Sequence, residues 1–184
     1  MLIPSFSRNL LKTLPFIQIL TIDNSEICLK IPADKLIPSL LFFRNHTNTQ
    51  YKLLSEICVI DFPTRLNRFE VIYTLLSIQF NSRIKIRLNC HELQTLPSSV
   101  SVYVCANWWE REIWDMFGIF YSNHPDLRRI LSDYGFEGHP LRKDFPLSGF
   151  SEVRYSESKK RIIYEPVTMP QEFRTFDFEN PWSQ

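Results

Sequence analysis

The chain has 184 residues, of which 44% are hydrophobic, and a formal net charge of +1. This length is enough for one domain with a sizeable core plus extensions, and the near-neutral charge gives no general attraction to nucleic acid or to anionic membranes. No apolar run approaches the roughly 20 residues that a membrane-spanning helix needs, so we expect membrane association only through partners.

The first 22 residues form an amphipathic segment that contains Arg8 and Lys12 but no acidic residue. This composition resembles a mitochondrial transit peptide. The alternative is an ordinary surface helix that belongs to the domain. We favour the helix, because the segment is retained at the start of the chain.

The region from Phe16 to Leu88 is dominated by strand patterns and interrupted by one helix. Turn-forming residues at Asp23-Asn24-Ser25 separate two β-rich runs and predict a hairpin, and Ala33–Asn45 has helical spacing. The predicted strands are Phe16–Ile22, Glu26–Ile31, Leu53–Phe62, Phe69–Phe80 and Arg83–Leu88. Together these elements predict an α+β fold with a mainly antiparallel sheet and helices on one side.

The last of these strands alternates three cations, Arg83, Lys85 and Arg87, with three aliphatic residues. We interpret its basic face as a solvated outer face that protects a sheet edge from aggregation. The alternative is an RNA-binding module, because phosphate contacts dominate nucleic-acid affinity. No aromatic RNA-binding motif lies beside this face, so we expect no nucleic-acid partner.

The four cysteines, Cys28, Cys58, Cys90 and Cys105, form no CxxC pair or other spacing typical of metal sites. A chain of this size with a large core does not need disulfides. We therefore expect buried free thiols in a reducing compartment, and no cluster held by this chain.

A short helix is predicted from Trp108 to Phe117. Asn107 and Glu110 have the spacing of a capping box, and Gly118 stands where a left-handed residue commonly ends a helix. The apolar stripe of this helix consists of Trp109, Ile113, Met116 and Phe117.

Beyond Gly118 the sequence is rich in proline, arginine and aromatic residues, and it predicts little regular structure. A long irregular arm loses much chain entropy unless it packs on a surface, and we favour a surface of a partner. The predicted organisation is an α+β domain at residues 1–117, followed at 118–184 by a long, largely irregular arm and tail that wraps partner subunits.

Catalysis by this part of the chain has little support. Glu110 and Glu112 are two residues apart on a helix, so they point about 200° apart and cannot act as a carboxylate pair. A metal-dependent enzyme remains an alternative, with a site of two histidines and one carboxylate. Its candidate ligands are His124, His139, Asp126, Asp133 and Asp144. Each histidine precedes a proline, which favours a role in supporting a turn.

The same stretch resembles a known family. Glu110-Arg111-Glu112, Asp115-Met116-Phe117, His124 and Arg128-Arg129-Ile130-Leu131, continued through Ser132 to Leu147, are similar to the defining pattern of the 30-kDa subunit of respiratory complex I. That family is also called NADH dehydrogenase subunit 9 or iron-sulfur protein 3. The resemblance is close over Asn107 to Tyr155, continues at Tyr164 to Val167 and Gln171 to Arg174, and is loose toward the N-terminus.

This resemblance implies a non-catalytic core structural subunit in the peripheral arm of proton-translocating NADH:ubiquinone oxidoreductase, supporting electron transfer from NADH to quinone. It implies contact with the 49-kDa subunit and the adjacent iron-sulfur subunit, on the matrix side of the mitochondrial inner membrane. FMN, the iron-sulfur clusters and ubiquinone would belong to other chains, and this chain would bind no cofactor. A retained N-terminal segment fits a subunit made inside the organelle, as in plants and many protists.

Arginine forks and aromatic rings are the side chains that most often anchor protein interfaces. We therefore predict contact residues in the motif-rich stretch and the tail, and no catalytic or metal-binding residue. The predicted interface residues are Trp109, Glu110, Arg111, Glu112, Asp115, His124, Arg128, Arg129, Asp133, Arg142, Asp144, Arg154, Glu165 and Arg174.

Overall fold

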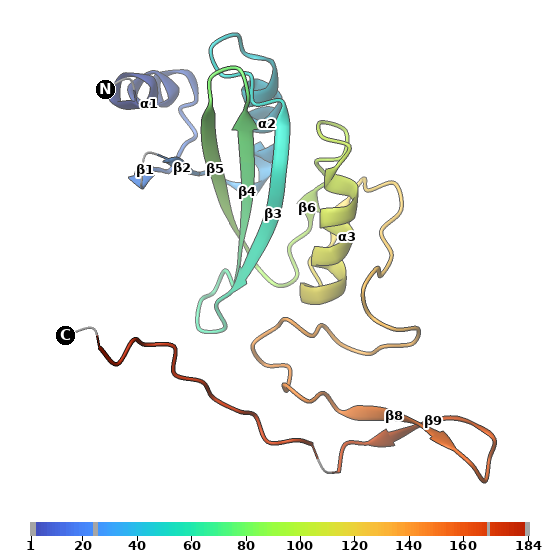
Figure 1. The fold of residues 1–184 in the computed structure, drawn as a ribbon. Helices are drawn as coiled ribbons and strands as arrows, with labels where there is room; N and C mark the ends of the chain where they lie inside the picture. Colours follow the sequence, from blue (N-terminus) through green and yellow to red (C-terminus); the bar gives the residue numbers. More distant parts are fainter. Residues whose placement is uncertain (1–2, 24–25, 169, 183–184) are drawn as a thin grey trace. The chain divides into compact units, whose positions relative to one another are not determined.

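The computed structural model describes residues 3–23, 26–168 and 170–182. The chain divides into two compact units, Met1–Phe145 and Pro146–Gln184 (Figure 1). The first unit therefore extends well past the predicted boundary at residue 117. The reason is a set of hydrogen bonds and ion pairs that ties residues 118–145 to the preceding domain.

The first unit is an α+β structure built on a five-stranded sheet. Its elements in chain order are α1 (Ile3–Thr13), β1 (Ile19–Asp23), β2 (Glu26–Lys30), the 3-10 turn η1 (Ala33–Lys35), α2 (Leu36–Asn45), β3 (Leu53–Asp61), β4 (Phe69–Ser77), β5 (Ser82–Cys90), β6 (Leu96–Pro97), α3 (Ala106–Phe117) and β7 (Tyr121–Ser122). The sheet order is β1-β2-β5-β4-β3, in which β2 and β5 run parallel and the other neighbours antiparallel. The prediction of a mainly antiparallel α+β fold is confirmed.

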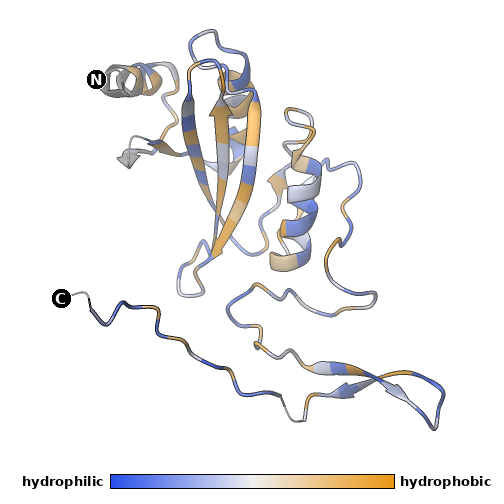
Figure 2. Ribbon diagram, in the orientation of Figure 1, coloured by the Kyte–Doolittle hydropathy of each residue, from blue (hydrophilic) through white to orange (hydrophobic). Residues whose placement is uncertain are grey.

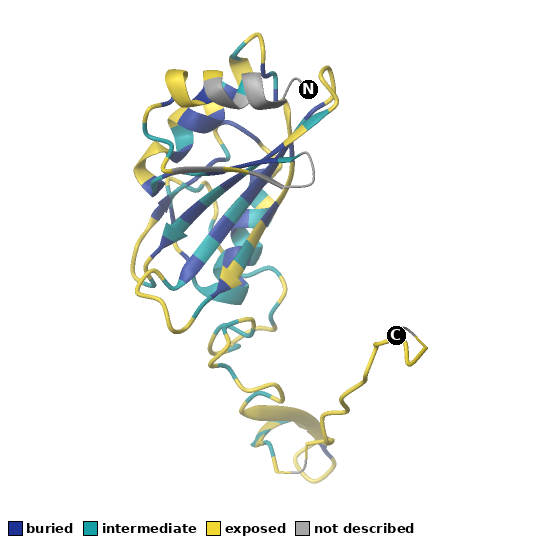
Figure 3. Ribbon diagram, turned by 90° about the vertical axis from the view of Figure 1, so that its left-hand side faces the viewer, coloured by how far each residue is buried: buried dark blue, intermediate teal, exposed yellow. Residues whose placement is uncertain are grey.

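Alternating side chains give the sheet one buried face. On β5, Ile84, Ile86 and Leu88 are fully buried, whereas Arg83 on the opposite face is exposed. The antiparallel register places Ile86 opposite Tyr73 of β4, which is also fully buried. Figures 2 and 3 show the same alternation along β3, β4 and β5, first as hydropathy and then as burial.

The helices complete the core on which this face packs. Leu10 of α1, Leu40 and Phe43 of α2 and Ile113 of α3 all belong to one cluster of buried apolar side chains. In Figure 1, α2 lies behind the strands and α3 beside β3. Since Leu10 is nearly fully buried, α1 packs as a helix of the domain.

The cysteines are free, but they are not uniformly buried. Cys28 and Cys90 are buried, whereas Cys58 and Cys105 are exposed, so the expectation of buried thiols is wrong for the latter pair. Cys58 pairs in register with Ile72, on the outer face of the sheet, and Cys105 immediately precedes α3. Burial raises the pKa of the Cys90 thiol to about 12, which keeps it protonated at neutral pH.

The second unit contains a hairpin that the sequence analysis missed. β8 (Ser151–Ser156) and β9 (Arg161–Pro166) pair antiparallel, and the described residues after them form no helix or strand. The register places Val153 opposite Tyr164 and Tyr155 opposite Ile162, so these four residues share one face, and all are more than half exposed. A two-stranded hairpin without a core is only marginally stable by itself.

Helix α3 starts two residues earlier than predicted, at Ala106. The predicted capping box does not form, because no side chain caps the N-terminus and Glu110 bonds elsewhere. The predicted C-terminal residue is confirmed. Gly118 has φ of 78°, and its N–H donates to the Trp114 carbonyl at 3.0 Å.

Replacement of Gly118 by alanine is expected to destabilise the first unit beyond the usual left-handed strain of about 1 to 2 kcal/mol. An added Cβ would lie 2.6 Å from both Arg142 Nη2 and His139 Nε2. Gly135→Ala is the matched control, since φ there is 70° and no atom lies within 4 Å of the added Cβ. Urea unfolding of the full chain measures both variants. Equal losses of unfolding free energy would contradict the close packing at Gly118.

Candidate partner interface

Asp115 is the residue on which the segment after α3 converges. Its side chain is fully buried. The carboxylate accepts the backbone N–H groups of Ile130, Leu131 and Ser132 at 3.1, 2.7 and 2.9 Å, the Ser132 hydroxyl, and Arg129 Nη1 at 2.9 Å. Burial alone would raise the pKa of Asp115, but the hydrogen bonds from Ser132 and its neighbours outweigh burial and hold that pKa below its usual range. The buried carboxyl is therefore ionised.

Two side chains from the same segment cap the C-terminal end of α3. Arg142 donates Nε–H to the Phe117 carbonyl at 2.6 Å, and His139 Nδ1 lies 3.0 Å from the Asp115 carbonyl oxygen. Burial lowers the pKa of His139, which favours a neutral ring that carries its hydrogen on Nδ1. These donors satisfy carbonyls that have no partner within the helix, and the guanidinium suits the negative end of the helix dipole.

A second ionic group ties the same segment to the sheet. Arg68, just before β4, donates to Asp61 at 2.7 Å and to Asp144 at 2.8 Å, and it lies 3.6 Å from Glu92. Arg142 also pairs with Glu92. The hydrogen bond from Arg68 lowers the pKa of Asp61, whose side chain is fully buried. We call this group, together with the Asp115 contacts and the α3 caps, the clasp.

Glu110 forms a separate buried contact. Its Oε1 accepts the N–H and hydroxyl of Ser99 at 2.7 and 2.6 Å, and its Oε2 accepts the Ser98 hydroxyl at 2.6 Å. His124 Nε2 lies 3.8 Å from Oε2. Burial raises the pKa of Glu110, although the serine hydrogen bonds oppose that rise. Glu110 thus fixes the loop after β6 to α3.

The predicted interface residues fall into two groups, those with buried side chains and those at the surface. The side chains of Glu110, Asp115 and His124 are fully enclosed by this chain, and Trp109 packs against the core. Because these four side chains are used inside the domain, we exclude them from the candidate interface. The sequence analysis could not separate them from surface residues, since motif membership does not specify burial.

Other predicted residues lie partly or fully at the surface. Arg111 donates to the carbonyls of Arg128 and Arg129 at 3.2 and 3.3 Å, and Arg129 and Arg142 are held by the clasp. The side chain of Arg128 is 71% exposed, paired with the exposed Asp126. The remaining predicted residues are Glu112, Asp133 and Asp144 in the first unit and Arg154, Glu165 and Arg174 in the second unit. Of these, Arg154 and Glu165 pair across the hairpin at 2.7 Å.

Exposed apolar residues that the sequence analysis did not identify as contacts lie on α3 and on the segment after it. Trp108 is 66% exposed and Tyr134 97% exposed, and Leu131 and Leu141 are also exposed. Residues advance by about 100° each around a helix, so the stripe that buries Trp109 turns Trp108 outward. That period was the signal that could have found Trp108. The exposure of residues 131, 134 and 141 could not be predicted from the sequence, because it depends on how the irregular segment after α3 folds.

The contacts do not favour either alternative function. His124 Nε2 lies 3.3 Å from the Asn107 carbonyl and its Nδ1 accepts the Asp126 N–H, while His139 Nδ1 bonds to the Asp115 carbonyl, so the two rings have different partners. Within residues 3–23, 26–168 and 170–182, no group of three or more histidine, cysteine or acidic residues could hold a metal ion.

The basic face of β5 is largely neutralised by acidic neighbours. Lys85 pairs with Glu26 at 2.5 Å and Arg87 with Glu70 at 3.6 Å. Two of its three cations are therefore not free for a phosphate backbone.

In the part of the chain that the structure describes, no helix has the length and apolar character needed to cross a membrane.

Comparisons with known proteins agree on one family. The sequence model of one protein family, the respiratory-chain NADH dehydrogenase 30 Kd subunit, matches residues 29–151 of this chain. The chain is 52% identical to NADH-ubiquinone oxidoreductase subunit 9 of Prototheca wickerhamii over 98% of this chain and 94% of that protein. It is 58% identical to NADH dehydrogenase (ubiquinone) iron-sulfur protein 3 of Solanum tuberosum, over 83% of this chain and 80% of that protein.

A solved structure shares the fold at low sequence identity. It belongs to a membrane-bound sulfane sulfur reductase, an archaeal respiratory membrane complex. The TM-score is 0.68, covering 78% of this chain and 85% of that chain at 20% identity.

Replacement of Asp115 by asparagine is expected to lower the free energy of unfolding by about 2 to 4 kcal/mol at neutral pH, because Arg129 loses its buried partner. The pKa of Asp115 is lowered by folding, so its stabilisation is present above the unfolded pKa of about 3.9 and is lost as the pH falls below it. The difference between wild type and Asp115→Asn should therefore narrow below about pH 4.

Urea titrations at neutral and acidic pH measure this difference. Asp133→Asn is the control, because Asp133 is exposed and its side chain accepts the N–H of the adjacent Tyr134 at 2.8 Å. We expect the control to change the unfolding free energy by less than about 0.5 kcal/mol. A constant difference between wild type and Asp115→Asn across this pH range would show that Asp115 is not ionised in the folded chain.

Proposed function

We propose a function for this chain from one premise: the chain belongs to the family of the respiratory-chain NADH dehydrogenase 30-kDa subunit. It is a core subunit of the peripheral arm of proton-translocating NADH:ubiquinone oxidoreductase, complex I. It is thus part of an enzyme that transfers electrons from NADH to quinone.

Within that enzyme, we assign this chain a structural role without catalytic activity of its own. The buried carboxylates of this chain are already engaged: Asp115 holds the segment after α3, Asp61 holds Arg68, and Glu110 holds Ser98 and Ser99. FMN, the iron-sulfur clusters and ubiquinone are then carried by other chains. This chain supports their chemistry by fixing the positions of its neighbours.

The observation that carries the proposal is a set of exposed anchors on α3 and on the segment that the clasp holds to it. Trp108, Leu131 and Tyr134 are exposed, and Arg128 lies between them in the sequence, next to residues bound by Asp115. Aromatic and arginine side chains are the commonest anchors of protein interfaces. Because the clasp fixes the backbone in advance, binding orders few further groups, which favours affinity and a defined geometry.

The second unit adds a different kind of binding element. Its hairpin has the exposed apolar face of Val153, Tyr155, Ile162 and Tyr164, and its tail exposes further aromatic rings. A hairpin of this kind gains stability by covering its apolar face on another surface. We propose that the hairpin and tail wrap neighbouring subunits, with Arg174 as a contact in the tail.

We propose that the partners are the 49-kDa subunit and the adjacent iron-sulfur subunit. The close similarity to mitochondrial complex I subunits supports this assignment. The same similarity supports a peripheral position at the mitochondrial inner membrane, on the matrix side. Attachment to the membrane is through the complex, which agrees with the lack of a spanning helix in the described residues.

Replacement of Trp108 or Arg128 by alanine tests this role. Loss of an interface anchor is expected to weaken partner affinity by about tenfold, or about 1.4 kcal/mol. The amount of assembled complex should fall, while turnover per assembled complex stays unchanged. Native gel electrophoresis with an NADH dehydrogenase stain measures the first quantity, and NADH oxidation normalised to that band measures the second.

The control is Arg83→Ala, because Arg83 is an exposed cation on the outer face of the sheet. It should leave both quantities at the wild-type level. Normal assembly combined with low turnover in Trp108→Ala and Arg128→Ala would contradict a purely structural role.

A further inference from the structure

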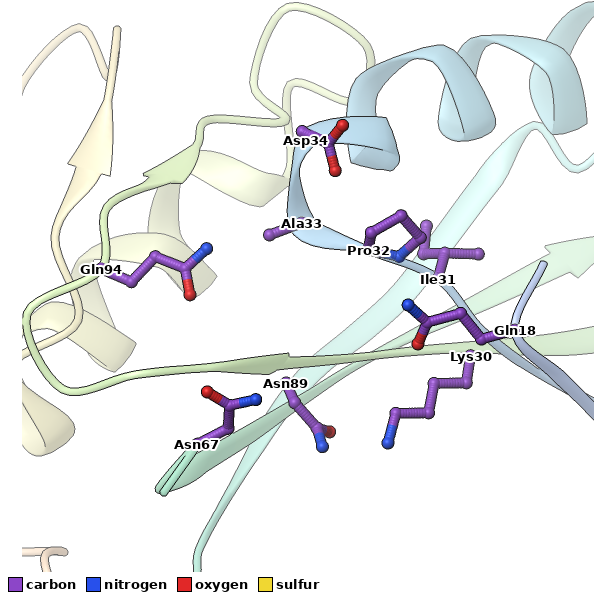
Figure 4. A pocket seen from close by; sticks show the side chains of 9 residues that line it. All are labelled: Gln18, Lys30, Ile31, Pro32, Ala33, Asp34, Asn67, Asn89 and Gln94. Carbon is purple, nitrogen blue, oxygen red and sulfur yellow. The ribbon is translucent and has the colours of Figure 1, made fainter. Parts of the chain in front are cut away.

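A polar pocket of about 340 Å³ lies beside the end of β2 and η1 in the first unit (Figure 4). Lys30 is partly exposed and Asp34 is exposed, so water solvates both charged groups of its lining. The pocket therefore points to no particular ligand. The hairpin of the second unit presents a better defined surface.

The two faces of the hairpin β8–β9 differ in chemistry. Residues paired across a hairpin share a face, and the faces alternate along each strand. One face is apolar and consists of Val153, Tyr155, Ile162 and Tyr164, which are 54 to 64% exposed. On the opposite face Arg154 and Glu165 form an ion pair at 2.7 Å. The charged face is therefore suited to water, whereas the apolar face is not.

The turn between β8 and β9 has a cluster of positive charge. Lys159, Lys160 and Arg161 are consecutive and exposed, and Glu157 is the acidic residue of the turn. Figure 1 shows this turn at the free end of the hairpin. Among the described residues, none of the three cations forms an ion pair, because the carboxylate of Glu165 is already paired with Arg154. The turn thus has positive charge that the second unit does not neutralise by direct contact.

Internal contacts fix the shape of this turn. The Ser156 side chain is buried, and its hydroxyl lies 3.1 Å from the Ser158 hydroxyl and accepts the Lys159 N–H at 3.4 Å. Lys160 has φ of 48°, in the left-handed region that completes a tight turn. The three cations are therefore presented from a defined backbone at the end of the apolar face.

We propose that the hairpin docks on a protein surface where an apolar patch is bordered by a cluster of carboxylates. This inference rests on the proposed function, and it specifies the chemistry of the surface that the hairpin covers. The apolar face covers the patch, and Lys159, Lys160 and Arg161 pair with carboxylates at its border. Opposite charges at the border of an interface steer association and fix orientation. The turn therefore determines where the hairpin docks.

An anionic lipid surface also attracts cations beside an apolar face. The backbone of the hairpin favours a protein instead. The sheet has two strands, so each strand has an outer edge whose N–H and C=O groups have no strand partner. The hydrocarbon region of a bilayer offers these groups no hydrogen bond, whereas a protein surface does.

Tryptic digestion and cross-linking of the intact complex test this proposal. Trypsin cleaves after lysine and arginine, and it should cut the turn at least about tenfold more slowly in the solubilised complex than in the free full-length chain. A carbodiimide joins a lysine amine to a carboxylate in direct contact. Mass spectrometry should find Lys159 or Lys160 joined to an aspartate or glutamate of another subunit.

Replacement of Lys159 by glutamate changes an attraction into a repulsion while the backbone N–H bond to Ser156 is kept. In the complex, cleavage after Arg161 should become about threefold to tenfold faster than in wild type, each rate being divided by that of the corresponding free chain. The control is Lys52→Glu, which reverses the charge of an exposed lysine in the first unit and should leave this ratio unchanged.

Four results would overturn the proposal. They are equal cleavage of the turn in the complex and the free chain, cross-links of Lys159 and Lys160 that are absent or confined to this chain, a wild-type ratio in Lys159→Glu, and binding of the full chain to phosphatidylserine vesicles that Lys159→Glu abolishes. If the turn is unprotected while Trp108→Ala and Arg128→Ala still lower assembly, the hairpin inference fails and the proposed function stands. If those two variants assemble normally with low turnover, the proposed function itself fails.

Discussion

The buried carboxylate of Asp115 is the interaction on which the order of residues 118–145 depends. A charge without solvent needs several donors, and Asp115 obtains them from three consecutive backbone N–H groups, a serine hydroxyl and Arg129. Those N–H groups belong to a segment without sheet partners, so the carboxylate replaces the ladder that a strand would provide. An irregular segment is thereby fixed to a helix without itself adopting regular structure.

This arrangement changes the meaning of the charged motif. Residues such as Glu110, Asp115 and Arg142 look like candidates for chemistry or for partner contacts when they are seen as a pattern. In the folded chain they fix the loop after β6, the segment after α3 and the end of α3 itself. The motif therefore identifies the family by specifying its internal scaffold. The exposed residues of this scaffold include large apolar side chains such as Trp108 and Tyr134.

The sequence predicted those features that depend on local periodicity. Strands β3, β4 and β5 and the end of α3 at Gly118 follow from alternation, helical spacing and backbone freedom, which act within a few residues. The capping box failed because Glu110 gains more from two buried serines than from the helix terminus. The clasp could not be predicted, since Arg68 and Asp144 meet across 76 residues. The hairpin β8–β9 was missed because neither strand has a buried face to impose a clear apolar pattern.

The two units differ in what stabilises them. This difference is consistent with partner binding in two steps, first by the first unit and then by the second. The first unit has a continuous core and an ionic clasp, so its surface exists before a partner arrives. In residues 146–168 and 170–182, by contrast, Ser156 is the one buried residue. An element with so little buried surface gains its order from the neighbour it covers, and it can adapt to that neighbour's shape. We expect the rigid surface to define orientation and the second unit to add contact area once that orientation is set.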